Sequence, residues 1–317
     1  SSQFGIPCLE AIHNSSHELV GVFTQPARPA GRHRSKLTPT DVATWCEEKN
    51  VTCTEAKNIN QPDMMAKLTA CNADLMVVIA FGQKISQDVI GLQKHRAVNV
   101  HASLLPKYRG AAPIHWAVMN GEEETGISII TLSDKMDAGE VLAQGKTAIL
   151  PEDNFNTMHE KLSLLSVPVL MDTIAQIQNG TAIYTEQDPA IVTYAPKLKK
   201  ADGYINWEQS ADEIVNHIRG LCPWPSAQSV FVSASTGKHW RVILSNSRMV
   251  ERASKPEDIV GQFDENLNVI CGQNALKILE IKPAGSHRMD FEAFVNGHQC
   301  EPGDLFISAE KALSGLF

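Results

Sequence analysis

Residues 97–106 read Ala-Val-Asn-Val-His-Ala-Ser-Leu-Leu-Pro, an apolar run that leads into a loop. The run predicts a β-strand over residues 97–101. Residues two apart on a strand share a face, so Asn99 and His101 point the same way. An amide and an imidazole are therefore expected to face a loop that could hold a ligand.

The acid Asp137 follows later, in the predicted turn Met136-Asp137-Ala138-Gly139-Glu140. An acid brought beside a histidine orients the ring and favours its charged form. A lone histidine after a strand is more often structural than catalytic. The combination of Asn-x-His, Ser-Leu-Leu-Pro and Asp-Ala-Gly-Glu is much more specific than any one of these motifs.

Strands and helices alternate through the first part of the chain. Residues 74–80 form a near-continuous apolar run, which is typical of a strand covered on both faces of a sheet. Further strands are predicted at 19–23, 97–101, 126–132 and 140–144, and helices at 38–49 and 156–178. This pattern predicts an α/β fold with a doubly wound, mostly parallel sheet. Ligands of such sheets bind beyond the carboxyl ends of the strands, where Asn99 and His101 lie.

The pattern changes after Gly180. Residues 185–204 have no clear period and indicate a linker, and 206–220 predict one helix. Short strands are predicted at 241–244, 268–271 and 275–281, with Gly, Pro and Asn between them, which indicates a small barrel or sandwich. We therefore expect a first domain at 1–183, a linker at 184–204 and a second domain at 205–317.

Composition excludes several classes of protein. The 317 residues are 43% hydrophobic and 20% charged, as expected for a globular chain of two domains. The net charge of −8 does not indicate nucleic-acid binding. Seven scattered cysteines without a CxxC pair indicate reduced thiols, and no metal-binding motif is present. With no membrane-length apolar run, we expect a cytoplasmic monomer that uses neither a membrane nor a metal.

The motifs resemble those of the folate-dependent formyltransferases. The Asn-Val-His and Ser-Leu-Leu-Pro motifs and the Arg-Gly-Ala-Ala-Pro-Ile run at 109–114 match almost residue for residue. The likeness continues through residues 193–198, 205–207, 223–225, 282–285 and 302–304. Within the family, the chain is most similar to the enzymes that formylate methionyl-tRNA. One departure is the turn at 136–140, where the family usually has Leu-Asp-Thr-Gly-Asp.

The resemblance implies both a reaction and a fold. A formyl group would pass from 10-formyltetrahydrofolate to the α-amino group of a charged initiator tRNA, and the second domain would be an OB-like barrel. Asn99 would donate to the oxyanion, His101 would move protons, and Asp137 would hold His101 in place. The substrate amine is the nucleophile, so no catalytic serine is needed. The implied folate loop consists of Ser103, Leu104, Leu105 and Pro106.

Two basic segments carry the expected contacts to RNA. The segment at 26–36 contains Arg28, Arg32, Arg34 and Lys36 and no acid, and the family's tRNA enzymes place such a loop at the acceptor end. Ala27 stands where the family usually has Asp. The predicted linker adds Lys197, Lys199 and Lys200. Residues 205–317 hold 10 Lys and Arg against 14 Asp and Glu, so we expect only weak, salt-sensitive RNA contact there.

The start of the chain departs from the resemblance. A helix is predicted to begin at Pro7, where the missing N–H of proline is tolerated. The related enzymes begin with a strand before this helix. We therefore expect roughly eight to ten further apolar residues upstream, the length of a strand and its turn.

Three alternatives stay open. A related enzyme that formylates an amino-sugar nucleotide would share Asn99, His101 and Asp137, although the basic segment at 26–36 favours tRNA. A folate- or RNA-binding module without catalysis is disfavoured because all three residues are intact. The related glycinamide-ribonucleotide transformylases lack a comparable second domain, so the length of this chain disfavours them.

Overall fold

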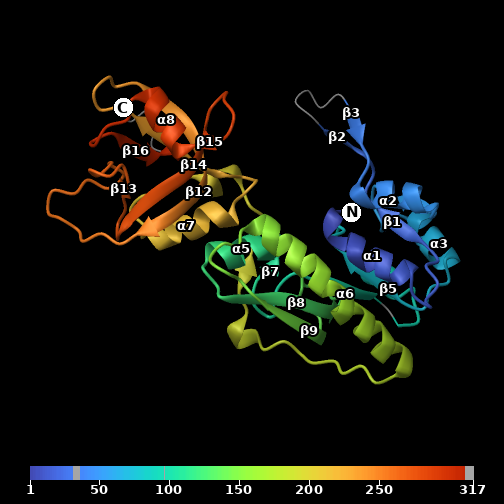
Figure 1. Ribbon diagram of the computed structural model, residues 1–317. Coiled ribbons are helices and arrows are strands. Elements are labelled where there is room, and N and C mark those ends of the chain that lie inside the picture. Colours follow the sequence, from blue (N-terminus) through green and yellow to red (C-terminus); the bar gives the residue numbers. More distant parts are fainter. Residues whose placement is uncertain (31–35, 96, 311–317) are drawn as a thin grey trace. The chain divides into compact units, whose positions relative to one another are not determined.

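The computed structural model describes residues 1–30, 36–95 and 97–310, which form two compact units. The first unit comprises residues 1–113, 124–148 and 159–195. The second comprises residues 114–123, 149–158 and the described chain from 196 onward (Figure 1). The main boundary, between Ala195 and Pro196, falls inside the segment expected to be a linker. The two short inserts of the second unit have no signature in the sequence.

A four-stranded sheet forms the centre of the first unit, in the order β5-β6-β8-β9. Its strands are β5 (Met76–Ile79), β6 (Ala97–His101), β8 (Glu124–Thr131) and β9 (Val141–Ala148). β5 and β6 are parallel, whereas β6, β8 and β9 pair antiparallel. A second parallel pair joins β1 (Val22–Thr24) to β4 (Cys53–Glu55). The expected α/β class is confirmed, and antiparallel strands are added on one side of the parallel part of the sheet.

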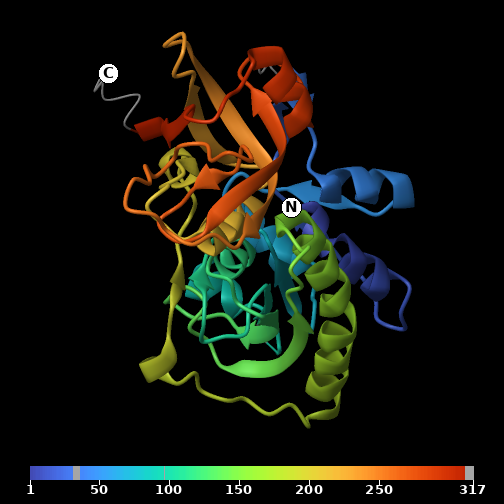
Figure 2. The same cartoon turned by 60° about the vertical axis from the view of Figure 1, so that its left-hand side comes forward.

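Helices flank these strands. They are α1 (Ile6–His13), α2 (Asp41–Lys49), α3 (Pro62–Ala70), α4 (Gln87–Ile90) and α6 (Phe155–Asn179). α2 begins at Asp41, three residues later than predicted, because Thr40 caps it and its side chain accepts a hydrogen bond from Ala43 N at 3.1 Å. α6 runs along the β8–β9 side of the sheet in both views (Figures 1 and 2). A Cβ at Gly145 would meet side chains of α6, so glycine lets this helix approach β9 closely.

Ser1 lies at the carboxyl ends of β1 and β5, each of which has a different parallel partner. The Ser1 hydroxyl accepts a hydrogen bond from Gln25 N at 3.1 Å, just after β1. The Ser1 ammonium group lies 3.4 Å from the carbonyl of Ala80, just after β5. α1 then begins with Pro7 in its first turn, as predicted. Within the described residues, β1 and β5 are not paired with each other, and the upstream strand stays a prediction.

The two short inserts join the second unit through side chains of α5 (Pro113–Met119) and α7 (Ala211–Gly220). His115 stacks on Phe155 with ring centroids 3.8 Å apart, and its Nδ1 donates to Gly220 O at 2.7 Å. Arg219 donates to the carbonyls of Leu150 and Asp153. The hydrogen bonds join residues more than 60 positions apart in the chain, which is why local sequence patterns did not reveal them.

The second unit is built on an antiparallel sheet in the order β13-β14-β12-β11-β16, with β15 beside β14. The strands are β11 (Ala227–Val232), β12 (His239–Val250), β13 (Val269–Ile270), β14 (Ala275–Pro283), β15 (Met289–Asp290) and β16 (Leu305–Ser308). Bridges from Gln262 to Leu305 and from Phe263 to Val269 link its two edges. The sheet is therefore nearly closed, which confirms the expected barrel.

Aromatic side chains fill the barrel, and two helices cover it. Phe231, Phe294 and Phe306 are almost completely buried, and Phe231 packs edge-on against Phe294 from α8 (Phe291–His298). α7 begins at Ala211 and not at 206 as predicted, because Ser210 and Glu213 form a reciprocal capping box there. Within the described ranges, no helix has the length and apolar character to cross a membrane.

Candidate active site

Asn99 and His101 lie on one face of β6, as the alternation of a strand requires. β6 is held between β5 and β8, with Asn99 opposite Val78 on one side and Ile130 on the other. Asn99 is half-buried, and its side-chain amide has no hydrogen bond to any described residue. Its N–H donors are therefore free to bind a ligand at the carboxyl end of the parallel pair.

His101 is 5% exposed and has an oxygen at each ring nitrogen. Its Nε2 donates to the carbonyl of Tyr108 at 3.0 Å, and its Nδ1 lies 3.6 Å from Asp137 Oδ2. Burial lowers the pKa of His101, while the Asp137 carboxylate and the Tyr108 carbonyl act in the opposite direction. Because a charged ring offers N–H groups to both oxygens, this arrangement can stabilise an imidazolium that forms during a reaction.

Asp137 reaches this position from a turn with a left-handed backbone conformation, φ 52°. Its Oδ2 accepts a hydrogen bond from Gly110 N at 2.9 Å, which fixes the carboxylate next to His101. A Cβ at Gly139 would lie 1.7 Å from the Thr131 carbonyl, so only glycine fits at this point of the turn. The structure thus brings together the three residues predicted to be catalytic, Asn99, His101 and Asp137.

The loop predicted to bind folate is tied to the neighbouring strands of the sheet. Ser128 Oγ accepts from Leu105 N at 3.0 Å and donates to Ser103 O at 2.7 Å. Gln144 Nε2 donates to Leu105 O at 2.9 Å. Ser103 and Leu105 are buried, whereas Leu104 and Pro106 are half-buried. The Ser103 hydroxyl donates to Lys107 O at 2.6 Å, so its side chain serves the shape of the loop.

A cavity of about 490 Å³ adjoins the Asp137 turn. Its wall is formed by the end of β8 with the residues after it, by the turn itself, and by Gln87, Glu186 and Gln187. This volume lies in the range of cavities that hold small molecules and cofactors. In the ranges described, no group of three or more His, Cys, Asp or Glu side chains could hold a metal ion.

The basic segment at 26–36 is partly described. It contains a short hairpin of β2 (Arg28–Ala30) and β3 (Lys36–Thr38). The side chain of Arg28 is exposed. Arg32, Arg34 and the side chain of Lys36 lie outside the described residues. The contribution of this segment to RNA binding stays a prediction.

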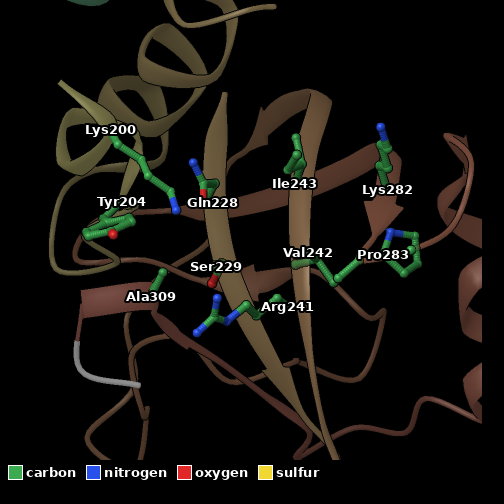
Figure 3. A pocket seen from close by; sticks show the side chains of 12 residues that line it. Lys200, Tyr204, Gln228, Ser229, Arg241, Val242, Ile243, Lys282, Pro283 and Ala309 are labelled. Atoms are coloured by element: carbon green, nitrogen blue, oxygen red, sulfur yellow. The ribbon is translucent and has the colours of Figure 1, made fainter. Parts of the chain in front are cut away.

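A second pocket, of about 270 Å³, lies in the barrel unit (Figure 3). Its 12 lining residues include three cations, Lys200, Arg241 and Lys282, and no acid. None of these three has an ion-pair partner among the described residues. Tyr204 and Gln228 complete one side of the pocket (Figure 3). Of the predicted RNA contacts in the linker, Lys200 lines this pocket, whereas Lys197 and Lys199 are exposed nearby in the chain.

Several residues of these sites were missed in the sequence. Arg241 and Lys282 belong to a region whose overall charge is acidic, so composition hid them. Tyr108 contributes only its carbonyl, which no side-chain pattern reports. Gln187 lies in the segment without periodicity, yet its amide donates to the carbonyls of Asp137 and Gly139.

Comparison with known proteins places this site in a family. The signature of the formyl transferases matches residues 2–174, and that of the formyl transferase C-terminal domain matches residues 197–299. A methionyl-tRNA formyltransferase of Geobacter metallireducens is 36% identical over 95% of this chain and 94% of its own. That of Alkaliphilus oremlandii is 37% identical over 96% of each chain.

Solved structures share the fold at lower identity. WlaRD, described as a sugar 3N-formyl transferase with dTDP and 5-N-formyl-THF, has a TM-score of 0.64 at 15% identity. The structural match covers 90% of this chain and 96% of the WlaRD chain. HypX from Aquifex aeolicus, solved with tetrahydrofolic acid, has a TM-score of 0.54 at 19% identity over 79% of this chain and 44% of its own. By its sequence, this chain belongs to the formyl transferase family, in the branch of the methionyl-tRNA formyltransferases.

Proposed function

We propose that the protein transfers the formyl group of 10-formyltetrahydrofolate to the α-amino group of methionine on charged initiator tRNA. The observation that carries this proposal is the geometry around β6. Asn99 presents free amide donors on the face that also carries His101, and Asp137 Oδ2 lies 3.6 Å from His101 Nδ1. The near full-length similarity to methionyl-tRNA formyltransferases supports this choice of substrate.

Each residue has a distinct task in formyl transfer. The Asn99 amide donates to the formyl oxygen, on which negative charge develops as the amine attacks. Because His101 Nε2 donates to Tyr108 O, the lone pair of the neutral ring is at Nδ1. Nδ1 takes the proton that the amine loses and returns a proton to the departing nitrogen. Asp137 stabilises the imidazolium between these two transfers. The substrate amine attacks the formyl carbon directly, so the enzyme needs no covalent intermediate of its own.

We infer that the folate lies across the loop 103–106 and the cavity beside the Asp137 turn. Leu104 and Pro106 offer the half-buried apolar surface of the loop, which suits one face of a flat ring. The cavity lining includes the acids Asp134, Glu140 and Glu186, whose carboxylates can accept hydrogen bonds from a ring that carries N–H groups. The chain's own residues therefore fit a folate, and no metal is required for the chemistry proposed.

The experiment that tests this function is a formylation assay with two acceptors in parallel. Purified protein and 10-formyltetrahydrofolate are incubated with charged initiator Met-tRNA or with an amino-sugar nucleotide. We expect formylation of the tRNA and none of the sugar. Formylation of the sugar alone would instead identify the protein as an enzyme that formylates an amino-sugar nucleotide. The same sample in size-exclusion chromatography with light scattering tests the expected monomer.

We also infer that RNA phosphates contact Arg28, Arg32, Arg34 and Lys36 of the basic segment and Lys197, Lys199 and Lys200 of the linker. The pocket in the barrel unit supports an RNA role for its own cations as well (Figure 3). Lys200, Arg241 and Lys282 line it without an acid, so their charges are available to a phosphate.

Replacing Arg241 or Lys282 by glutamine is expected to raise KM for Met-tRNA. It should also lower the slope of log affinity against log salt by about one for each phosphate that the variant no longer binds. Lys238→Gln is the matched control, because Lys238 is exposed and does not line the pocket. Equal salt slopes in Arg241→Gln, Lys282→Gln and the control would remove the pocket from the RNA surface.

A further inference from the structure

Residues 185–195, expected to be part of a linker, form a strap fixed at both ends to the first unit (Figures 1 and 2). At one end, Thr185 and Val141 of β9 exchange two backbone hydrogen bonds, at 2.8 and 2.9 Å. At the other end, β10 (Tyr194–Ala195) pairs in parallel with β7 (Arg109–Gly110). Between these ends most side chains are exposed, and Gln187 is half-buried.

Two residues with left-handed backbone conformations hold the ring of His101. Tyr108, with φ 62°, supplies the carbonyl that accepts from Nε2, and Asp137, with φ 52°, supplies the carboxylate beside Nδ1. Residues that carry a Cβ rarely adopt this backbone conformation, because the Cβ crowds the following carbonyl. Such conformations persist only where surrounding contacts impose them.

The strap supplies contacts to both of these residues. Thr193 Oγ1 accepts from Tyr108 N at 2.8 Å, and Thr193 O accepts from the next amide, Arg109 N, at 2.9 Å. A Cβ at Gly110 would lie 2.4 Å from the Ala195 carbonyl, so the strap passes directly against β7. The conformation of Tyr108 is thus fixed from the strap side.

The side chain of Gln187 fixes the backbone of the Asp137 turn from the strap. Its Nε2 donates to Asp137 O at 2.8 Å and to Gly139 O at 2.7 Å, on either side of Ala138. Its Oε1 accepts from Arg109 Nε at 3.0 Å and from Nη2 at 2.8 Å. One amide therefore joins the turn that carries Asp137 to the residue that precedes Gly110, whose N–H holds the Asp137 carboxylate.

We propose that residues 185–195 are a positioning strap for the catalytic site, in which Gln187 sets Asp137 and Thr193 sets Tyr108 against His101. The strap touches no reacting atom and acts through these two contacts of the ring. The inference rests on the proposed function only for its kinetic consequences. The placement of Asp137 beside His101 is a property of the free protein and can be measured without substrate.

Loss of Gln187 frees the Asp137 turn to relax from its left-handed conformation. The carboxylate then moves away from Nδ1, and the imidazolium loses its stabilising charge. Among the described residues, Asp137 is the charge recorded as acting on the ring, whereas Asn99 on β6, Ser128 opposite His101 on β8 and the Tyr108 carbonyl are neutral. Asp137 is the charge that raises the pKa of His101, so its displacement lowers that pKa further.

The test compares Gln187→Ala and Gln187→Glu with Gln178→Ala, a control at an exposed glutamine on α6. We expect Gln187→Ala to lower kcat by about 10- to 100-fold, the scale of a small misplacement of catalytic groups. The NMR titration of the His101 ring, assigned by comparison with His101→Gln, should move to lower pH. Gln187→Glu keeps the acceptor for Arg109 but loses both donors, so it should be as impaired as Gln187→Ala.

Thr193 provides a second, milder test. Thr193→Val keeps the shape but removes the acceptor of Tyr108 N, and we expect kcat to fall by about tenfold. Thr193→Ser keeps the hydroxyl and should restore the rate. A purely structural strap would lower Tm and leave both the His101 titration and kcat of the folded protein unchanged.

The proposal is overturned if Gln187→Ala keeps the wild-type His101 titration, or if Gln187→Glu retains the wild-type rate. Failure of the proposed function looks different. The wild-type protein would then not formylate the tRNA, while the NMR titrations of the same variants would still decide whether the strap positions Asp137.

Discussion

Replacement of Asn99 by alanine is expected to lower kcat for formyl transfer by ~100- to 1000-fold, the usual effect of losing one oxyanion donor. The amide of Asn99 makes no hydrogen bond to any described residue, so the change removes a donor to substrate and breaks no internal hydrogen bond. Stability should therefore change little. The measurement is the single-turnover rate with Met-tRNA and saturating 10-formyltetrahydrofolate, together with Tm from thermal unfolding.

Two further measurements test whether the effect of Asn99→Ala is specific to the oxyanion. Binding of 5-formyltetrahydrofolate, followed by protein fluorescence, should be retained in Asn99→Ala. Asn99→Asp has the same size but replaces the donors with a negative charge, so it should be at least as slow. A rate within tenfold of wild type in Asn99→Ala would mean that other donors hold the oxyanion.

The second large effect is expected from Asp137→Asn. Asparagine tolerates the left-handed conformation and still offers an oxygen to Gly110 N, so the turn should be retained. The charge beside His101 is lost, and the rate should fall by roughly 100- to 10,000-fold, the range for general acid–base catalysis.

The pH dependence of Asp137→Asn follows from the groups that act on His101. Burial lowers the pKa of His101, and the Asp137 carboxylate opposes this effect. Removing the carboxylate leaves burial less opposed, so the ring should lose its proton at a lower pH than in wild type. NMR titration of His101 measures this shift directly. An unchanged titration combined with a rate near wild type would reduce Asp137 to a residue that only shapes the turn.

Much of this protein could be predicted from local patterns. The strand at 97–101 and the long helix near 156–178 were found within a residue or two, because apolar spacing reports which face of an element is buried. The shared face of Asn99 and His101 follows from the period of a strand alone. The helix at 206–220 was predicted too early because its capping pair, Ser210 and Glu213, was overlooked.

The segment at 185–195 shows why other parts could not be predicted. Gln187 contacts residues 48 to 78 positions away, and it reaches them from a stretch without periodicity. Its partners are mostly backbone carbonyls, which every residue possesses. No residue pattern distinguishes such a strap from an exposed linker, because the information lies in which distant carbonyls the folded chain presents.

Local patterns and family motifs were enough to predict the α/β class, the barrel that follows it, and Asn99, His101 and Asp137 as the catalytic residues. These depend on spacing within single elements and on motifs shared with a family. The folded structure was needed to show how Gly110 N holds Asp137 beside His101, how a strap contacts both partners of the ring, and that Arg241 and Lys282 share a pocket with Lys200. Strand pairing and loop anchoring join residues far apart in the chain, and local periodicity carries no record of such partners.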